Sequence, residues 1–157
     1  SAMREMVNLF KFEGMLPLGR ELGRQLGTAI AGLPTMFSKV DTVVPVPLHP
    51  FRRFKRGFNQ SAMLAWEIAE RNELPLDEKC LVRQRNTPPQ SSLKPEKRRK
   101  RLKGAFAADK ALVKGKCLLL VDDVVTTEAT VRECARVLKK AGASKVLVVT
   151  VARAEMM

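Results

Sequence analysis

The sequence predicts a single α/β domain built on a mainly parallel, twisted sheet with helices on both faces. An unbroken apolar segment of strand length, residues 116–121, precedes a helical pattern over 129–141 and a second strand pattern over 145–151. Strand, helix and strand of these lengths form a right-handed crossover unit with parallel strands. The 157 residues suffice for one buried core, and nothing in them suggests a second domain.

The first helix is expected near the start of the chain. Residues 7–31 carry apolar side chains at a mostly helical spacing. Pro17 suits the first turn of a helix and Gly32 suits its end. Residues 1–3 resemble the remnant of a cleaved tag, so we expect the domain to cover residues 4–157.

The next elements are a strand and a helix. Residues 42–46 form a β-branched run that predicts a strand, and Pro45 and Pro47 make its exit rigid. A basic segment follows. The apolar pattern that comes next predicts a helix ending near Arg71, with Asn59 as its N-cap.

The middle of the chain predicts a short strand, a loop and a short helix. Residues 81–83 are strand-like, and residues 84–94 are rich in Pro, Ser, Thr and Gln. Such a segment lacks the apolar content to pack, so we expect it to be mobile. Residues 95–103 predict a basic helix started by Pro95, which completes a mobile basic region over about 84–103. A polar connection then leads to the apolar strand.

Several classes of site are excluded by the residues present. The three cysteines, Cys80, Cys117 and Cys134, are far apart in apolar segments and are expected to be reduced core residues. His49 is the only histidine, which argues against a histidine-based metal site or triad. There is no signal peptide and no apolar run long enough to span a bilayer, so we expect a cytoplasmic protein.

The charge balance is strongly basic. Lys and Arg number 29 against 16 Asp and Glu, a formal net charge of +13. The two densest basic blocks are residues 52–56 and 94–103. A solubilising surface is one explanation, and attraction of polyanions is the other.

The apolar strand ends on residues suited to a phosphorylated sugar. Asp122 and Asp123 follow it directly and can accept hydrogen bonds from a vicinal diol. Thr126, Thr127 and Thr130 lie at the start of the next helix, whose unpaired N–H groups and dipole favour an anion. A diol site beside a phosphate site predicts a ribose 5-phosphate ligand.

These residues also carry a family resemblance. Leu119 to Val131 resembles the phosphoribosyl-pyrophosphate (PRPP) signature of type I phosphoribosyltransferases. The likeness extends over about residue 7 to Arg153. Further blocks resemble the ComF/GntX family of competence-associated, phosphoribosyltransferase-like proteins: Val44-Pro45-Val46-Pro47-Leu48-His49, Arg56-Gly57-Phe58-Asn59-Gln60, Thr87-Pro88-Pro89-Gln90 and Gly104-Ala105-Phe106.

The resemblance implies a type I phosphoribosyltransferase fold and roles for particular residues. Asp122 and Asp123 would be the catalytic acids that bind the ribose hydroxyls. Mg²⁺ would enter with PRPP, reached by one of these aspartates through water and by no direct protein ligand. The family often carries a four-cysteine zinc module upstream, and we expect no zinc in this chain. The residues around the 5-phosphate would be Thr126, Thr127, Glu128, Ala129 and Thr130.

Three other segments would complete the substrate site. The turn after the first strand would contact the pyrophosphate, and two arginines could grip it in a bidentate fork, although a solvated surface is the alternative for them. The loop after residue 83 would close over the sugar. The residues are Val46, Pro47 and Leu48 in the turn, Arg53 and Arg56 in the basic segment, and Arg85 and Gln90 in the loop.

Two positions depart from the family pattern. Glu128 stands where the family has Gly and adds a Cβ and a carboxylate beside the expected phosphate. Like charges in a partly buried site repel, and a non-Gly residue is strained if the turn needs a positive φ. PRPP binding is therefore expected to be weakened or lost, which leaves open whether the chain is an enzyme. Arg101 stands where the family usually has Asn.

Two functions remain open at this point. One is a PRPP-binding protein, with phosphoribosyl transfer as its potential activity, linked to competence and DNA uptake, with other competence proteins as partners and a homodimer as a common assembly of this fold. The other is a non-catalytic factor that binds single-stranded DNA through its phosphates. Its binding residues would be Arg98, Arg99, Lys100 and Arg101.

Overall fold

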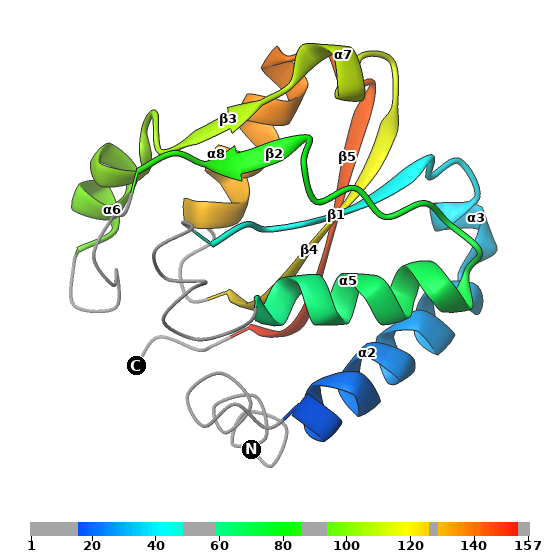
Figure 1. Ribbon diagram of the computed structural model, residues 1–157. Coiled ribbons are helices and arrows are strands. Elements are labelled where there is room, and N and C mark those ends of the chain that lie inside the picture. Colours follow the sequence, from blue (N-terminus) through cyan, green and yellow to red (C-terminus); the bar gives the residue numbers. More distant parts are fainter. Residues whose placement is uncertain (1–15, 49–58, 86–93, 126–128, 154–157) are drawn as a thin grey trace.

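The computed structural model describes residues 16–48, 59–85, 94–125 and 129–153 (Figure 1). Its main sheet has three parallel strands in the order β1-β4-β5, and a smaller antiparallel sheet pairs β2 with β3. The strands are β1 (Thr42–Pro45), β2 (Leu81–Arg83), β3 (Phe106–Ala108), β4 (Cys117–Val125) and β5 (Lys145–Arg153).

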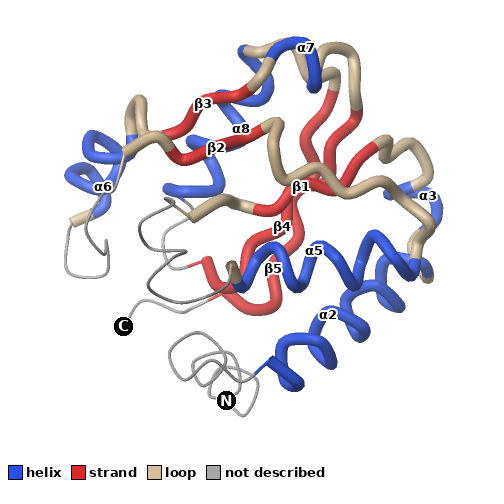
Figure 2. Tube along the Cα trace, viewed as in Figure 1, coloured by secondary structure: helices blue, strands red, loops and turns tan. Residues whose placement is uncertain are grey.

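Helices cover both faces of the main sheet, as Figures 1 and 2 show. Helices α2 and α5 lie side by side on one face, and α8 lies on the other together with the β2–β3 pair. The described helices are α2 (Leu16–Ala31), α3 (Pro34–Phe37), α5 (Gln60–Arg71), α6 (Pro95–Leu102), α7 (Lys110–Val113) and α8 (Ala129–Lys140).

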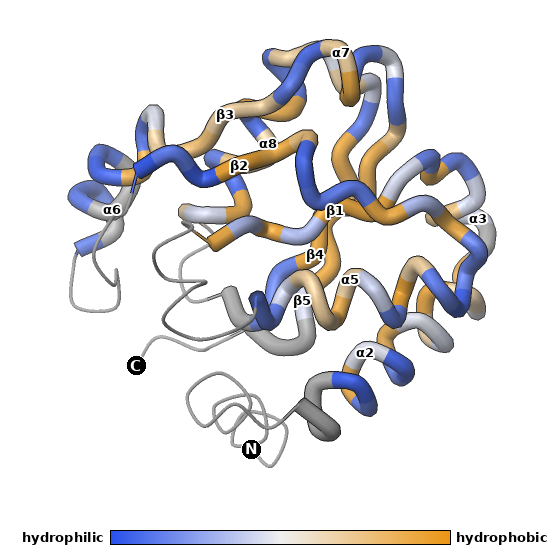
Figure 3. The backbone as a smooth tube through the Cα atoms, viewed as in Figure 1, coloured by the Kyte–Doolittle hydropathy of each residue, from blue (hydrophilic) through white to orange (hydrophobic). Residues whose placement is uncertain are grey.

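Strand β4 is the centre of the molecule. Its residues alternate between the two faces, so that Leu118 and Leu120 pack toward α8 while Leu119 and Val121 pack toward α2 and α5. All four are 0–1% exposed. Figure 3 shows this strand as one of the most hydrophobic parts of the chain. A run that is apolar at every position suits a strand buried on both faces.

Close contact between α2 and α5 depends on glycine. A Cβ at Gly23 would lie 2.7 Å from the Glu67 Cβ, and one at Gly27 would lie 3.2 Å from the Arg71 Cβ. The Asn72 side chain joins the same two helices, because its Nδ2 donates to the Gly27 carbonyl oxygen at 3.1 Å. The absence of side chains at these glycines therefore sets the distance between the helices.

Most of the predicted elements are confirmed. Helix α2 ends at Ala31, β1 lies in the β-branched run, β2 covers the expected residues 81–83, and α6 begins at Pro95. Asn59 is the N-cap of α5, and its side chain accepts a hydrogen bond from the Ser61 amide at 3.0 Å. The α/β class, with a parallel sheet and helices on both faces, is also confirmed.

Three features of the sheets differ from the prediction. Strand β4 does not end before the acids but continues to Val125, because its backbone still pairs with β5 through Arg153. The expected polar connection after Phe106 contains the short elements β3 and α7. Strand β5 has the apolar pattern of a central strand but lies at the edge of the described sheet, and its Val148 is 42% exposed.

The cysteines lie in the core. Cys80, Cys117 and Cys134 are free thiols and buried, as predicted. Burial raises the pKa of Cys80 to about 12, and it also raises those of Cys117 and Cys134, so these thiols are poor nucleophiles. None of the helices in the described part of the chain is both long and apolar enough to cross a bilayer.

Candidate functional site

The candidate site lies at the carboxyl end of the main sheet. Strands β1 and β4 run parallel and end at the same edge, where Val46 N donates to the Val121 carbonyl oxygen at 2.8 Å. Helices α5 and α8 both begin near this edge (Figure 1). In open parallel sheets ligands bind at this end of the strands.

Two buried acids occupy this edge. Asp122 is 8% exposed and Asp123 is 7% exposed. The Asp122 Oδ1 atom accepts two hydrogen bonds, from the Asp123 backbone amide at 2.9 Å and from the Ser61 hydroxyl at 3.1 Å. The two carboxyl groups also interact with each other through their side chains. The structure thus brings both predicted acids together at the end of β4.

Burial changes the acidity of Asp122. Desolvation, followed by the charge of Asp123, raises the pKa of Asp122 to about 7. The hydrogen bonds from Ser61 and the Asp123 amide act in the opposite direction, because they stabilise the carboxylate. Near neutral pH the Asp122 carboxyl is therefore close to its midpoint of ionisation, and a ligand that prefers either form will shift it.

The start of α5 connects the two strand ends. Asn59 Nδ2 donates to the Val46 carbonyl oxygen at 3.2 Å, while its Oδ1 caps the helix. One turn of helix thus touches the exit of β1 through Asn59 and the acid pair through Ser61. Ser61 is not among the predicted site residues. A hydroxyl in the first turn of a helix that follows a parallel strand is the signal that could have found it.

The first turn of α8 supplies the other end of the site. Ala129 is 8% exposed, Thr130 is half-buried, and the first turn of the helix carries no acidic residue. The amides and the positive dipole at the start of a helix suit an anion, and the role of this turn in holding a phosphate stays a prediction. Six of the predicted site residues lie outside the described part of the chain: Arg53, Arg56, Gln90, Thr126, Thr127 and Glu128.

A small cavity lies beside the exit of β1. It has a volume of about 180 Å³, and the predicted Pro47 and Leu48 line it, whereas Val46 is buried in the core. Arg83 also lines it and was not predicted as a site residue. Its guanidinium is buried over the Phe106 ring, 5.1 Å from the ring centre. The remaining lining residues are Pro45, Asn59, Glu78, Leu81 and Val82.

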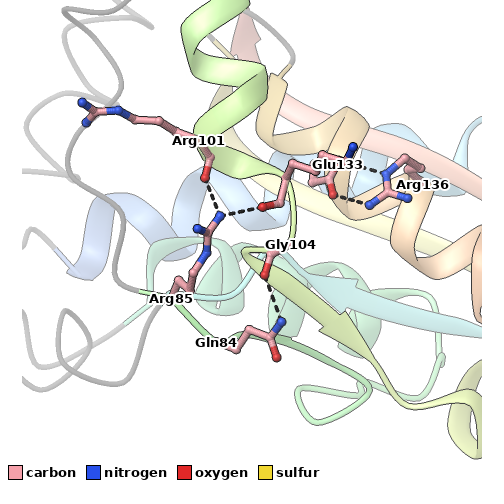
Figure 4. A network of polar contacts seen from close by, with 7 residues as sticks. Gln84, Arg85, Arg101, Gly104, Glu133 and Arg136 are labelled. Atoms are coloured by element: carbon pink, nitrogen blue, oxygen red, sulfur yellow. Dashed lines mark hydrogen bonds and ion pairs between the residues drawn. The ribbon is translucent and has the colours of Figure 1, made fainter.

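Arg85 binds backbone rather than the acid pair. Its Nη2 donates to the carbonyl oxygens of Arg101 at 2.7 Å and Lys103 at 2.6 Å (Figure 4). Next to it, Gln84 Nε2 donates to the Gly104 carbonyl oxygen at 2.9 Å. Both side chains thus secure the chain at the end of α6, and the role of Arg85 toward a substrate stays a prediction.

The same network reaches α8. Glu133 pairs with Arg136 at 2.6 Å, and Figure 4 shows this pair beside Gly104. Hydrogen bonds from Arg136 and from the Gly104 backbone amide contribute to lowering the pKa of Glu133. Helix α6 is therefore held against α8 at its carboxyl end, where Leu102 is 1% exposed.

The other side of α6 is basic and solvent-facing. Lys97, Lys100 and Arg101 are exposed on this helix. The side chains of Arg98 and Arg99 lie outside the described ones. The structure thus confirms that the basic segment is a helix with cationic side chains in solvent, and it leaves the choice between a solubilising and a binding surface open.

The acids fit a magnesium ion that arrives with its substrate. Within the described ranges no group of three or more His, Cys, Asp or Glu side chains could form a complete metal site. Two adjacent carboxylates do exist, at Asp122 and Asp123. Mg²⁺ is commonly held by one or two carboxylates together with substrate phosphates and water. This donor set matches that mode.

The sequence is similar to a known domain family and to two kinds of bacterial protein. The sequence model of the phosphoribosyl transferase domain matches residues 59–155. Competence protein F from Haemophilus influenzae is 32% identical over 153 residues, which are 95% of this chain and 67% of that protein. DNA utilization protein YhgH from Escherichia coli O157:H7 is 34% identical over 145 residues, 91% of this chain and 63% of that protein. The chain thus spans about two thirds of the length of these relatives.

A solved structure shares the fold. Glutamine phosphoribosylpyrophosphate (PRPP) amidotransferase from B. subtilis, complexed with ADP and GMP, aligns with a TM-score of 0.57 and 23% identity over 85% of this chain and 26% of that chain. At this level of identity the likeness concerns the fold alone. It confirms the predicted type I phosphoribosyltransferase-like arrangement.

Proposed function

Because this chain belongs to the phosphoribosyl transferase domain family, as the ComF/GntX resemblance predicts, we propose that it binds PRPP or a closely related phosphosugar at the carboxyl end of β4. The observation that carries the proposal is the buried pair Asp122 and Asp123. Burying two neighbouring acids is unfavourable unless hydrogen bonds or protonation compensate, and a buried carboxyl group with a perturbed pKa in such a position is typical of functional sites.

Each part of the site would hold one part of the ligand. Asp122 and Asp123 would accept hydrogen bonds from the ribose diol. The first turn of α8, with the Ala129 amide and the Thr130 hydroxyl, would bind the 5-phosphate together with the preceding Thr residues. The turn after β1 would face the pyrophosphate. Bound Mg²⁺ would supply neutralisation of the pyrophosphate charge.

Transfer from bound PRPP is the reaction that such a site would support. The bond between C1 of the ribose and the pyrophosphate oxygen breaks, pyrophosphate leaves with the bonding electrons, and an acceptor nucleophile, usually a nitrogen, forms the new bond to C1. The protein's contribution would be orientation of the sugar and stabilisation of charge. Glu128 stands against this activity, because its carboxylate adds negative charge next to the phosphate position.

A calorimetric titration with PRPP and Mg²⁺ tests the binding proposal. We expect measurable affinity that requires Mg²⁺ and that Asp122→Asn lowers at least tenfold. Asp109→Asn is the matched control, because Asp109 caps α7 at the amino end of β4 and Asn is an equally good cap. Equal PRPP affinity of wild type and Asp122→Asn would refute the binding proposal. It would also be refuted if neither the wild type nor Glu128→Gly bound PRPP.

The Glu128→Gly variant also addresses the family departure. Glycine removes both the charge and the Cβ at this position, so we expect PRPP to bind more tightly if Glu128 disables an otherwise intact site. Unchanged affinity would mean that the turn tolerates the glutamate.

We also propose a role in the uptake or use of DNA, supported by the names of the relatives, competence protein F and DNA utilization protein. The specific feature that favours direct contact with DNA is the exposed basic side of α6, with Lys97, Lys100 and Arg101. Single-stranded DNA would bind to these side chains through its phosphates, and the predicted Arg98 and Arg99 would add to the same surface. This second function does not require PRPP chemistry.

A further inference from the structure

Helix α5 begins with three buried polar residues. Asn59 is 9% exposed, Gln60 is 2% exposed and Ser61 is 4% exposed. Polar side chains in the first turn of a surface helix commonly face water, and burying them is costly unless they are hydrogen-bonded. This turn therefore makes specific contacts, and two of them reach the candidate site.

The Ser61 contact fixes one oxygen of Asp122. The Ser61 hydroxyl donates to Asp122 Oδ1 at 3.1 Å, across 61 positions of sequence. The same oxygen accepts the Asp123 amide at 2.9 Å. The terminal torsion of an aspartate is otherwise broad. Two donors on Oδ1, one from helix α5 and one from the backbone of β4, restrict rotation of the carboxyl group and leave Oδ2 with a defined direction.

The Asn59 contact fixes the neighbouring strand end. Asn59 Nδ2 donates to the Val46 carbonyl oxygen at 3.2 Å, and its Oδ1 accepts the Ser61 amide at 3.0 Å. The exit of β1, the start of α5 and the acid pair on β4 are therefore joined by consecutive hydrogen bonds. A shift of Ser61 would move the acceptor that the ribose hydroxyls are proposed to meet.

We propose that Ser61 is the positioning residue that orients Asp122 toward a vicinal diol and so makes the site prefer ribose over 2-deoxyribose. This inference rests on the proposed function. A diol presents two hydroxyl donors on adjacent carbons, and both need acceptors in a fixed relation. A carboxylate that is free to rotate would still accept a hydrogen bond from one hydroxyl, but it would gain little affinity from the second hydroxyl of a diol. Loss of Ser61 should therefore affect ribose ligands selectively.

The test compares two sugars on four proteins by calorimetry: wild type, Ser61→Ala, Ser61→Thr and Ser144→Ala. The ligands are ribose 5-phosphate and 2-deoxyribose 5-phosphate, each with Mg²⁺. We expect wild type to bind ribose 5-phosphate about tenfold more tightly than 2-deoxyribose 5-phosphate. Ser61→Ala should weaken the binding of ribose 5-phosphate about tenfold, which corresponds to the loss of one hydrogen bond. The same variant should change the affinity for 2-deoxyribose 5-phosphate less than about twofold. Ser61→Thr keeps the hydroxyl and should restore the preference.

The control variant makes the same chemical change far from the site. Ser144 is exposed next to the amino end of β5, so Ser144→Ala should retain the ribose preference. If wild type binds ribose 5-phosphate and Ser61→Ala keeps both its affinity and its preference, the inference is overturned while the proposed function stands.

A measurement without ligand distinguishes a failure of the Ser61 inference from a failure of the proposed function. In NMR spectra at one fixed pH, Ser61→Ala should move the ¹³C signal of the Asp122 carboxyl carbon and the amide signal of Asp123, and Ser144→Ala should move neither. If wild type binds no phosphosugar, the proposed function fails and these signals decide whether Ser61 orients the acid pair. Unmoved signals in Ser61→Ala would overturn the inference irrespective of binding.

Discussion

Asp122 makes the protein less stable at and above neutral pH than at lower pH. Its pKa is raised from 3.8 in the unfolded reference to about 7 in the fold, mainly by desolvation. The folded state therefore holds a proton that the unfolded state releases between these values. Stability from this group is fully present below pH 4 and is lost as the pH rises through 7.

The Asp122→Asn variant should be stabilised at high pH relative to wild type. Asparagine cannot ionise, so it avoids the desolvated charge at pH 8, whereas at pH 5 both side chains are neutral. We expect the difference in melting temperature, variant minus wild type, to be several degrees larger at pH 8 than at pH 5. Thermal denaturation at both values measures this, and an equal difference at both would contradict the raised pKa.

The pairing of α2 with α5 depends on the absence of side chains at its closest point. A Cβ on Gly23 would lie 2.7 Å from the Glu67 Cβ and 2.9 Å from its Cγ, distances that force the helices apart. Since α5 carries Asn59 and Ser61, this pairing also supports the helix that holds the acid pair. Packing remote from the site thus contributes to its geometry.

Gly23→Ala should therefore destabilise the fold. We expect the free energy of unfolding to fall by about 1–2 kcal/mol, because overpacking outweighs the better helix propensity of alanine. Gly32→Ala is the control, since its Cβ would come no nearer than 3.4 Å to the Ala29 carbonyl oxygen, and it should stay within about 0.5 kcal/mol of wild type. Urea denaturation measures both, and equal values would show that α2 and α5 adjust freely.

Arg85 is one of the side chains that hold helix α6 at its carboxyl end. Arg85 donates to the carbonyl oxygens of Arg101 and Lys103, which lack helical partners there. We expect Arg85→Ala to speed hydrogen exchange of the α6 amides several-fold, with α8 unchanged. Lys100→Ala on the exposed side of α6 is the control and should leave exchange as in wild type. Unchanged exchange in Arg85→Ala would mean that Leu102 packing and the contacts to Gly104 hold the helix without this arginine.

Local signals explain which elements could be predicted. The apolar run of β4, the Asn59 cap and the start of α6 at Pro95 each depend on neighbouring residues, and all three are confirmed. Strand β3 could not be found in this way, because its three residues gain their strand character only by pairing with β2, which lies 23 to 27 positions earlier. Short non-local pairing leaves no periodic pattern.

In the candidate site, too, local signals reveal some residues and miss those that depend on distant contacts. Asp122 and Asp123 were evident from their position after an apolar run. Ser61 was missed, since its partner lies 61 positions away and no local pattern links the two. The continuation of β4 past the acids was missed for a similar reason: it depends on the pairing of Val125 with Arg153 on β5.

At the scale of the whole molecule, the described cations that contribute to the charge of +13 lie in separate places. Lys97, Lys100 and Arg101 lie on α6, whereas other lysines lie toward the amino end of the sheet, at α7 and in the last turn of α8 (Figure 1). A general electrostatic attraction would depend only on total charge, while a binding surface depends on location.

Replacing the three α6 cations by Gln should weaken single-stranded DNA binding and reduce its salt dependence. The plot of log K against log salt concentration has a negative slope, and the loss of three phosphate contacts should make this slope shallower by about 2. The control removes the same charge at Lys110, Lys114 and Lys140, all exposed, and should leave the slope near that of wild type. Equal losses in both triple variants would indicate non-specific attraction instead of an α6 surface.

The most direct test of the phosphosugar site is NMR mapping of the amides while PRPP and Mg²⁺ are added. We predict shifts concentrated at Asp122, Asp123, Ala129 and Thr130, with the indole of Trp66 on α5, which is 51% exposed, unmoved. Shifts confined to the α2–α5 surface, or none at millimolar PRPP, would contradict the assignment of this site.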